Sequence, residues 1–379
     1  MITKANLDLE LQDYLASTSN IKADSNKRYR ALNTAIQKLQ QNNWMFSVRK
    51  TVFEYLTDLK EYNIENYLGL SDFKEPYILD GKPMLDPRRF NENAESFAYR
   101  MKNGGYYLSV NLNKGNSKLI DSLADYDNDG AWAVADDAVN LTEDSNEYKE
   151  IGSLKFNVDV SNSAENKATI TNSTKSVQDL SDYEDRSYFL LWVYLPSTSI
   201  TSVTLRWGSD ASNYWYKTET LPVNESSLQI GWNRFVFSWE DATETGTPDD
   251  TAVDYYSISI NYTASFTDTN NFRIEDLRLN TREQFDFEYF STKMIKNTNT
   301  NVYQEEFSLD TSTESLDAPT DLKPLVAQLA FYELLRKSKN VDKYERQEAQ
   351  AEIKELTDRA LDKYGYTPKK GIKRINIKK

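Results

Sequence analysis

The chain has 379 residues, 39% of them hydrophobic, and a formal charge of −14, yet it contains no cysteine and no histidine. These two absences exclude disulfides, thiolate nucleophiles, zinc fingers, iron–sulfur sites, imidazole bases and Ser-His-Asp triads. Carboxylate or lysine chemistry and oxygen-ligand ions such as Ca²⁺ remain. We therefore expect a protein that is not an enzyme and that requires no cofactor.

The remaining composition favours a folded protein. The chain holds 25 tyrosines, 16 phenylalanines and 7 tryptophans, which argues against disorder. No apolar run reaches about eighteen residues, so we expect no membrane partner. The first residues lack the apolar segment of a signal peptide, and we expect synthesis in a cytoplasm.

The charge is concentrated in the middle of the chain. Residues 115–283 contain 12 basic and 29 acidic residues and six of the seven tryptophans, whereas the rest is nearly neutral. A central block that differs from two similar flanks indicates an inserted domain, since insertions are tolerated at exposed loop tips. The boundaries that we predict are 1–113 and 284–365 for one discontinuous domain, 114–283 for the insert and 366–379 for a basic tail.

Both flanks combine helices with strands. Apolar spacing predicts a first helix through Leu7 and Leu11, and a second helix capped by Asp24 or Ser25. Residues 96–102 and 106–112 flank Asn103-Gly104-Gly105, which predicts a β-hairpin. After two strands within 285–307, Pro319 or Pro324 begins a helix, and Gly365 ends the last one.

This order of elements, with Trp44-Met45-Phe46 after the second helix and Ala318-Pro319 before the late helix pair, resembles the head–tail adaptor (connector) proteins of tailed phages. The resemblance implies a homo-oligomeric ring of about twelve copies at the neck of a virion. It also implies that portal and tail or neck proteins are partners, and that packaged DNA passes through without sequence-specific binding. The alternative is an unrelated α+β domain that oligomerises through its helices.

The tail carries six positive charges and no acid. In the adaptor interpretation it contacts the portal or a neighbouring subunit. A disordered solubilising end is an equal alternative, and a nucleic-acid arm is a third. The candidate contact residues are Lys369, Lys370, Ile372, Lys373, Arg374, Ile375 and Ile377.

The insert is predicted to be all-β. Eight short strand-like segments lie between residues 153 and 279 with turn residues between them, which is typical of a sandwich or jelly roll. The segment Tyr188–Leu195 is apolar throughout, and Gly231-Trp232-Asn233 precedes another strand. These features, with the closing segment Phe272–Leu279, resemble the galactose-binding-like jelly rolls of carbohydrate-binding modules. The predicted fold class is thus α+β multidomain, a helical adaptor core with β-hairpin elements interrupted by an all-β jelly-roll or sandwich domain.

One aromatic cluster in the insert is a candidate glycan site, because sugars bind to flat aromatic faces and to polar groups that reach their hydroxyls. The alternative is core packing, which we expect for Trp192 and Trp232 in any case. The candidate glycan residues are Trp207, Tyr214, Trp215, Tyr216, Asp210 and Asn213, with Arg206 beside them.

The segment 125–136 follows a calcium-loop pattern. Asp125, Asp127 and Asp129 occupy positions 1, 3 and 5, glycine stands at position 6 and Asp136 at position 12. The shorter Asp at position 12 and the lack of flanking helices depart from that pattern, and an acidic turn before the first tryptophan is the alternative. Asp182 and Asp276 form a second candidate oxygen-ligand site.

Two functions follow from these observations. The first is a virion structural protein, a connector ring at the head–tail junction that carries a decorating carbohydrate-binding-like domain. The alternative is a standalone carbohydrate-binding or adhesion protein that multimerises through its helices. No two acids are paired across a cleft by the sequence, so glycoside hydrolysis is not expected.

Overall fold

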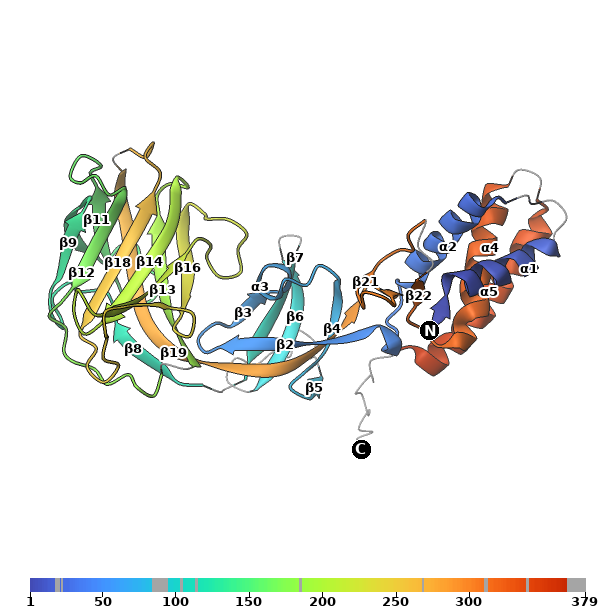
Figure 1. Ribbon diagram of the computed structural model, residues 1–379, viewed down its shortest axis with the longest axis horizontal. Helices are drawn as coiled ribbons and strands as arrows, with labels where there is room; N and C mark the ends of the chain where they lie inside the picture. Colours follow the sequence, from blue (N-terminus) through green and yellow to red (C-terminus); the bar gives the residue numbers. More distant parts are fainter. Residues whose placement is uncertain are drawn as a thin grey trace, which may run out of the picture. The chain divides into compact units, whose positions relative to one another are not determined.

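The computed structural model describes residues 1–17, 21, 23–83, 95–102, 105–112, 115–183, 186–267, 269–309, 313–338 and 341–366. The chain divides into two compact units (Figure 1). The helical unit comprises Met1–Thr51, Ser71–Pro83 and Asp286–Lys379, and the sandwich unit comprises Val52–Leu70 and Met84–Phe285. This division differs from the boundaries inferred from charge, because residues 52–70 and 84–113 belong with the sandwich.

The predicted fold class is wrong. Strands account for 42% of the structure and helices for 23%, and the strand pairings are antiparallel. The chain is therefore a mainly β protein resembling a β-sandwich, without a helical adaptor core. The sequence analysis gave the helices at the two ends too much weight, since the larger unit is built almost entirely from strands.

In the helical unit, four helices pack together around α4 (Figure 1). Thr3 and Asp24 cap the first two helices by accepting from backbone N–H groups, and Asp342 caps the last. The core of this unit includes Leu11, Ile36 and Val326. The helices are α1 (Lys4–Ala16), α2 (Ser25–Leu39), α4 (Lys323–Lys337) and α5 (Lys343–Tyr364).

Short strands complete the helical unit. Strand β4 pairs with the C-terminal part of β19 and with β5. Four other strands form a small sheet in the order β1-β22-β20-β21. Short 3-10 turns at Met45–Ser47 and Thr320–Leu322 connect these elements. The strands are β1 (Ile2–Thr3), β4 (Phe73–Leu79), β5 (Lys82–Pro83), β20 (Ile295–Asn297), β21 (Tyr303–Gln304) and β22 (Glu314–Leu316). Two long strands, β2 (Val48–Leu56) and β19 (Thr269–Ser291), continue from one unit into the other.

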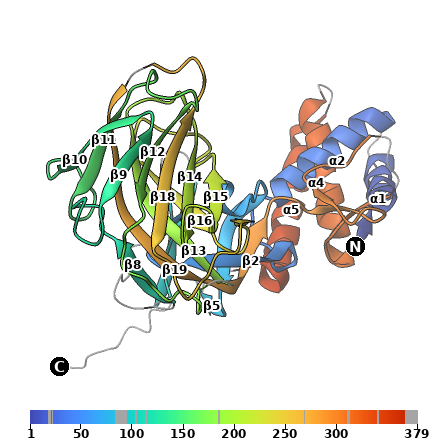
Figure 2. The ribbon, with the colours of Figure 1, turned by 60° about the vertical axis from the view of Figure 1, so that its left-hand side comes forward.

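Two antiparallel sheets form the sandwich of this unit (Figure 2), which confirms the predicted all-β architecture of the insert. The first sheet has six strands in the order β17-β15-β14-β18-β12-β9. These strands are β9 (Trp132–Asp136), β12 (Lys167–Asn172), β14 (Ile200–Gly208), β15 (Tyr214–Glu219), β17 (Thr243–Thr245) and β18 (Tyr255–Tyr262).

The second sheet has the order β10-β11-β19-β13-β16, and β8 pairs with β19. The two sheets enclose one hydrophobic core, in which Phe189 of the second sheet lies against Trp207 of the first. The remaining strands of this sheet are β8 (Ser117–Asp121), β10 (Ala138–Asp144), β11 (Ser153–Val158), β13 (Ser187–Leu195) and β16 (Gly231–Ser238).

A three-stranded sheet in the order β3-β7-β6 also belongs to the sandwich unit. Strands β6 (Ser96–Lys102) and β7 (Gly105–Asn111) pair antiparallel, which confirms the predicted hairpin; residues 103 and 104 of its turn lie outside the described residues. Strand β3 (Glu61–Asn63) continues into the short helix α3 (Ile64–Leu68). Asn224 ties this sheet to the sandwich by hydrogen bonds with Asn63 and Asn66.

Candidate functional site

Two of the predicted glycan residues are part of the sandwich core. Trp207 is 0% exposed and Trp215 is 6% exposed, and both rings contact Trp239. Because side chains alternate along a strand, Val203, Leu205 and Trp207 of β14 all point inward. The prediction that these two tryptophans bind sugar is wrong: their rings fill the space between the two sheets.

Asp210 and Asn213 hold the β14–β15 loop in place. The Asp210 carboxylate accepts from the Asn213 side chain (Nδ2 to Oδ2, 2.9 Å) and from the Ser212 backbone (2.6 Å). These hydrogen bonds lower the pKa of Asp210, since they favour its ionised form. Asn213 Oδ1 in turn accepts from the Thr247 backbone at 2.9 Å. Both side chains are therefore used to fix the loop, beside the strand end where Tyr214 begins.

Tyr214 and Tyr216 lie on the outer face of the six-stranded sheet. They alternate with Trp215, which points into the core, and both are partly exposed. Each faces a cross-strand neighbour, Tyr214 opposite Gly208 and Tyr216 opposite Arg206. On the other side of β14, Gly208 is paired with Tyr255 and Arg206 with Ser257. The rings of Tyr216 and Tyr255 each lie 6.2 Å from that of Tyr214, centroid to centroid.

The rest of this outer surface is made of hydroxyl and amide side chains, and we call it the hydroxyl face. The register of the strands sets its members, because residues directly opposite one another share a face. A sequence signal for it existed in the alternation Ser257-Ile258-Ser259-Ile260-Asn261, which the sequence analysis did not use. The face consists of Lys167, Thr169, Thr171, Ser202, Thr204, Arg206, Tyr214, Tyr216, Thr218, Tyr255, Ser257, Ser259 and Asn261.

The hydroxyl groups form hydrogen-bonded pairs across the strands. Thr169 lies 2.8 Å from Ser259, and Thr171 donates to Ser257 at 3.1 Å, oxygen to oxygen. Ser257 is 1% exposed and Ser259 is 3% exposed, although both point away from the core. Longer neighbouring side chains therefore cover these short serine and threonine side chains. We call this buried layer of hydroxyl groups the polar floor of the face. Of these four residues only Thr171 is not buried, so only its hydroxyl lies near the surface that a ligand could reach.

Arg206 lies on β14, one of the two central strands of this face, and among the described residues no carboxylate is paired with it. Its guanidinium carbon lies 5.0 Å from the centre of the Tyr214 ring, a cation–π contact. The Nε–H group is shielded from solvent and has no hydrogen-bond partner among the described residues. In that part of the chain Arg206 also forms no ion pair. A shielded donor without a partner is unfavourable.

The tryptophans that we expected in the core, Trp192 and Trp232, instead lie on the outer face of the second sheet and are partly exposed. Trp192 is flanked by the cations of Arg234 (5.0 Å) and Lys149 (5.5 Å), and Trp232 packs edge-on against Tyr194. This orientation could not be predicted from the sequence because Tyr188–Leu195 is apolar on both faces.

This second outer face is largely covered by other parts of the same unit. Glu275, opposite Trp192, is fully buried and accepts from the backbone N–H groups of Lys149 and Ile151 at 2.5 and 3.1 Å. The loop before β11 is thereby held over the sheet. At the other end, the Tyr188 hydroxyl donates to the Thr57 carbonyl at 2.8 Å.

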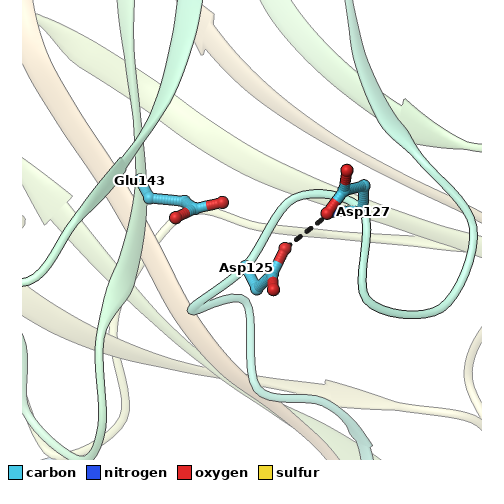
Figure 3. A group of neighbouring side chains, drawn as sticks. All are labelled: Asp125, Asp127 and Glu143. Carbon is cyan, nitrogen blue, oxygen red and sulfur yellow. Dashed lines mark hydrogen bonds between the residues drawn. The ribbon is translucent and has the colours of Figure 1, made fainter.

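Of the predicted calcium ligands, the structure brings only Asp125 and Asp127 together (Figure 3). The third neighbouring carboxylate is that of Glu143 on β10, which the sequence analysis missed because it lies outside the loop. The Asp127 backbone N–H donates to Asp125 at 3.1 Å and lowers its pKa, whereas the adjacent Asp125 carboxylate raises the pKa of Asp127. All three side chains are exposed.

Asp129 and Asp136 have other partners. Asp129 accepts from the Ser176 hydroxyl at 2.7 Å and pairs with the buried Lys175 ammonium at 3.0 Å; these contacts lower its pKa to about 2. Lys175 also pairs with Asp121 at 2.9 Å and so anchors the loop to the sandwich. Asp136 pairs with Lys167 at 3.6 Å.

The other predicted sites have separate outcomes. Asp276 of the second oxygen-ligand site forms an ion pair with Arg278 at 2.6 Å, and it is not grouped with Asp182 among the described residues. The predicted portal-contact segment, residues 369–377, lies outside the described residues. Within the described part of the chain, no helix is both long and apolar enough to span a membrane.

No protein-family profile and no curated protein matches the sequence. Among solved structures, the chain is similar to a family 30 carbohydrate-binding module, with 13% identity over 40% of this chain and 92% of that one and a TM-score of 0.31. It is also similar to the family 30 module of a cellulosomal cellulase of Clostridium thermocellum, with 14% identity, 43% and 96% coverage and a TM-score of 0.30. A third is the Clostridium thermocellum xylanase fragment holding a family 22 module and a catalytic module, with xylohexaose bound, at 13% identity, 44% and 28% coverage and a TM-score of 0.26.

Proposed function

We propose that the sandwich unit binds a carbohydrate chain on the hydroxyl face and does so without catalysing a reaction. The observation that carries this proposal is the combination, on one outer sheet surface, of two partly exposed tyrosines, an unpaired guanidinium and a floor of serine and threonine hydroxyls. Sugar rings present apolar C–H faces and polar hydroxyl edges, and this surface offers a counterpart to each.

Tyr214 and Tyr216 have different roles in the proposed binding site. The Arg206 guanidinium lies over the Tyr214 ring and occupies space on one side of it. Tyr216 is directly opposite Arg206 and has a ring contact only with Tyr214 among the described aromatic residues. We therefore assign the main sugar-stacking role to Tyr216, and to Tyr214 the role of positioning Arg206. Thr171 and Thr218, which lie on the same face and are not buried, then meet the sugar hydroxyls.

The experiment is a binding measurement with soluble polysaccharides of different backbones, using the full chain. Tyr216→Ala should weaken binding about tenfold or more, since burial and stacking of one ring contribute roughly 1.4 kcal/mol. Tyr148→Ala is the matched control, because Tyr148 is a 44% exposed tyrosine of the same unit that lies outside the hydroxyl face. If Trp192→Ala abolishes binding and Tyr216→Ala does not, the second sheet is the binding surface and the proposal is wrong.

The other functional predictions stay predictions from the sequence. They are the connector ring, its portal and tail partners, and its place in a virion. Nothing in the comparisons supports a head–tail adaptor, and the alternative prediction, a carbohydrate-binding protein that multimerises, is the better supported of the two.

A further inference from the structure

The charge of Arg206 on the hydroxyl face indicates which carbohydrates this face takes, an inference that rests on the proposed function. Arg206 lies between Tyr216 on one side and Ser257 on the other, in the middle strands of the sheet. Neither neighbour can neutralise a guanidinium at neutral pH. Its only described contact is the ring of Tyr214, which holds the group in place without supplying a counter-charge.

Arg206 differs from the half of the cations in its surroundings that are paired with carboxylates. The region between residues 115 and 283 has 29 acidic residues for 12 basic ones, so carboxylate partners are abundant. Lys175, Arg273 and Arg278 each have such a partner within 3.0 Å. Arg206 has none among the described residues, and its Nε–H is shielded and unpartnered. Leaving a partly buried charge in this state is unfavourable unless a ligand supplies the opposite charge.

The chemistry of the guanidinium selects the ligand. Its planar array of N–H donors matches the paired oxygens of a carboxylate or the oxygens of a sulfate ester, and hydrogen bonds between such charged groups are about twice as strong as neutral ones. Neutral sugar hydroxyls would already be met by Thr171, Thr218 and Asn261, which lie on the same face and are not buried. We infer that the hydroxyl face binds a polysaccharide whose sugars carry an oxyanion, a carboxylate or a sulfate ester, and that Arg206 binds this group.

The net negative charge of the unit does not prevent an oxyanion from binding in direct contact with Arg206. Charges separated by more than about 8 Å are largely screened at physiological ionic strength. A direct contact between Arg206 and an oxyanion is short, and the surface around it is formed by uncharged side chains, Tyr214, Tyr216 and Ser257. Local complementarity therefore decides the selectivity.

The test compares ligands that differ only in charge. Polygalacturonate is compared with its fully methyl-esterified form, and a sulfated galactan with its desulfated form, by calorimetry on the full chain. We expect wild-type protein to bind one charged member about tenfold or more tightly than its neutral counterpart. The pair that shows this preference identifies the oxyanion as carboxylate or sulfate.

Substitutions of Arg206 test whether this residue causes the preference for the charged polysaccharide. Arg206→Gln should remove the preference while binding of the neutral form persists, and Arg206→Lys should retain only part of it, because an ammonium lacks the bidentate geometry. Arg186→Gln, at an exposed arginine of the same unit, should behave as wild type. Equal binding of charged and neutral forms overturns this inference and leaves the proposed function intact. Failure to bind any polysaccharide overturns both.

Discussion

The Arg206 guanidinium carbon lies 5.0 Å from the centre of the Tyr214 ring, although Arg206 is paired across the strands with Tyr216. The arginine therefore leans one residue pair along the sheet, toward the end where Tyr214 and Tyr255 stand. This displacement places the charge near the Tyr214 end of the hydroxyl face, and among the described residues the Tyr216 ring has no cation–π contact. The contact between Arg206 and Tyr214 thus positions the guanidinium and also leaves the Tyr216 ring free to stack on a sugar, as the proposed function requires.

Trp207 and Tyr216 should differ sharply in their effect on stability. Trp207→Ala removes a fully buried ring and leaves a cavity between the sheets, so we expect a loss of about 3–5 kcal/mol in the free energy of unfolding. Tyr216→Ala acts on a partly exposed ring of the outer face and should cost much less. Denaturant unfolding followed by tryptophan fluorescence measures both. A Trp207→Ala protein as stable as wild type would show that this ring is outside the core.

The anchor of the 125–131 loop should make stability depend on pH in the acid range. Hydrogen bonds from Ser176 and the Lys175 charge lower the pKa of Asp129 to about 2 in the folded protein, below its value of about 3.9 in an unfolded chain. The stabilisation is therefore complete above about pH 4 and is lost as the pH falls toward 2.

Asp129→Asn provides the comparison for that pH dependence. The difference in melting temperature between wild type and variant should be largest near neutral pH and should shrink between about pH 4 and pH 2. Asp159→Asn is a control, because Asp159 also has a lowered pKa but accepts only from Ser161 within its own turn. A wild-type–variant difference for Asp129 that is constant across this range would contradict the assigned ion pair.

Calcium binding stays a prediction, now with a different set of residues. If Asp125, Asp127 and Glu143 bind Ca²⁺, the ion should raise the melting temperature and a chelator should lower it, because a ligand of the folded state stabilises that state. Glu143→Gln should remove the shift, whereas Asp136→Asn should keep it, since Asp136 is paired with Lys167. An unchanged melting temperature with and without chelator would rule out this site.

The ring predicted from the sequence is testable independently of the fold class. Helix α5 buries only Ala349 and Ala360 of its 22 residues, which leaves most of its surface available for other copies of the chain. We propose self-association through the helical unit, and single-molecule mass measurement should show particles larger than one chain; the count of about twelve stays a prediction from the sequence resemblance. A monomer at micromolar concentration would contradict both.

Much of the local structure was accessible from the sequence because it depends on local patterns. Apolar spacing located the helices, Asn103-Gly104-Gly105 located a hairpin, and apolar runs and alternation located eight of the twelve strands of the insert, all but β8, β9, β10 and β17. The same alternation also shows that Arg206 and Trp207, as neighbours in one strand, cannot share a face. The candidate glycan cluster combined both faces, and only the half that includes Tyr214 and Tyr216 lies on the outer surface.

Features that depend on tertiary contacts were not accessible in this way. Glu143 joins Asp125 and Asp127 only because β10 runs beside the acidic loop. Trp192 is partly exposed because a loop tied to Glu275, rather than a third layer of strands, covers its sheet. Assignment of residues 52–70 to the sandwich unit likewise follows from long-range contacts such as that between Tyr188 and Thr57.

The central claim is that the hydroxyl face binds carbohydrate, and the most direct measurement is the affinity of wild type, Tyr216→Ala and Tyr148→Ala for the same soluble polysaccharide. We predict that Tyr216→Ala loses about tenfold or more in affinity while Tyr148→Ala binds as wild type and all three proteins unfold at similar denaturant concentrations. Equal affinity of wild type and Tyr216→Ala for every polysaccharide that the protein binds would contradict the claim.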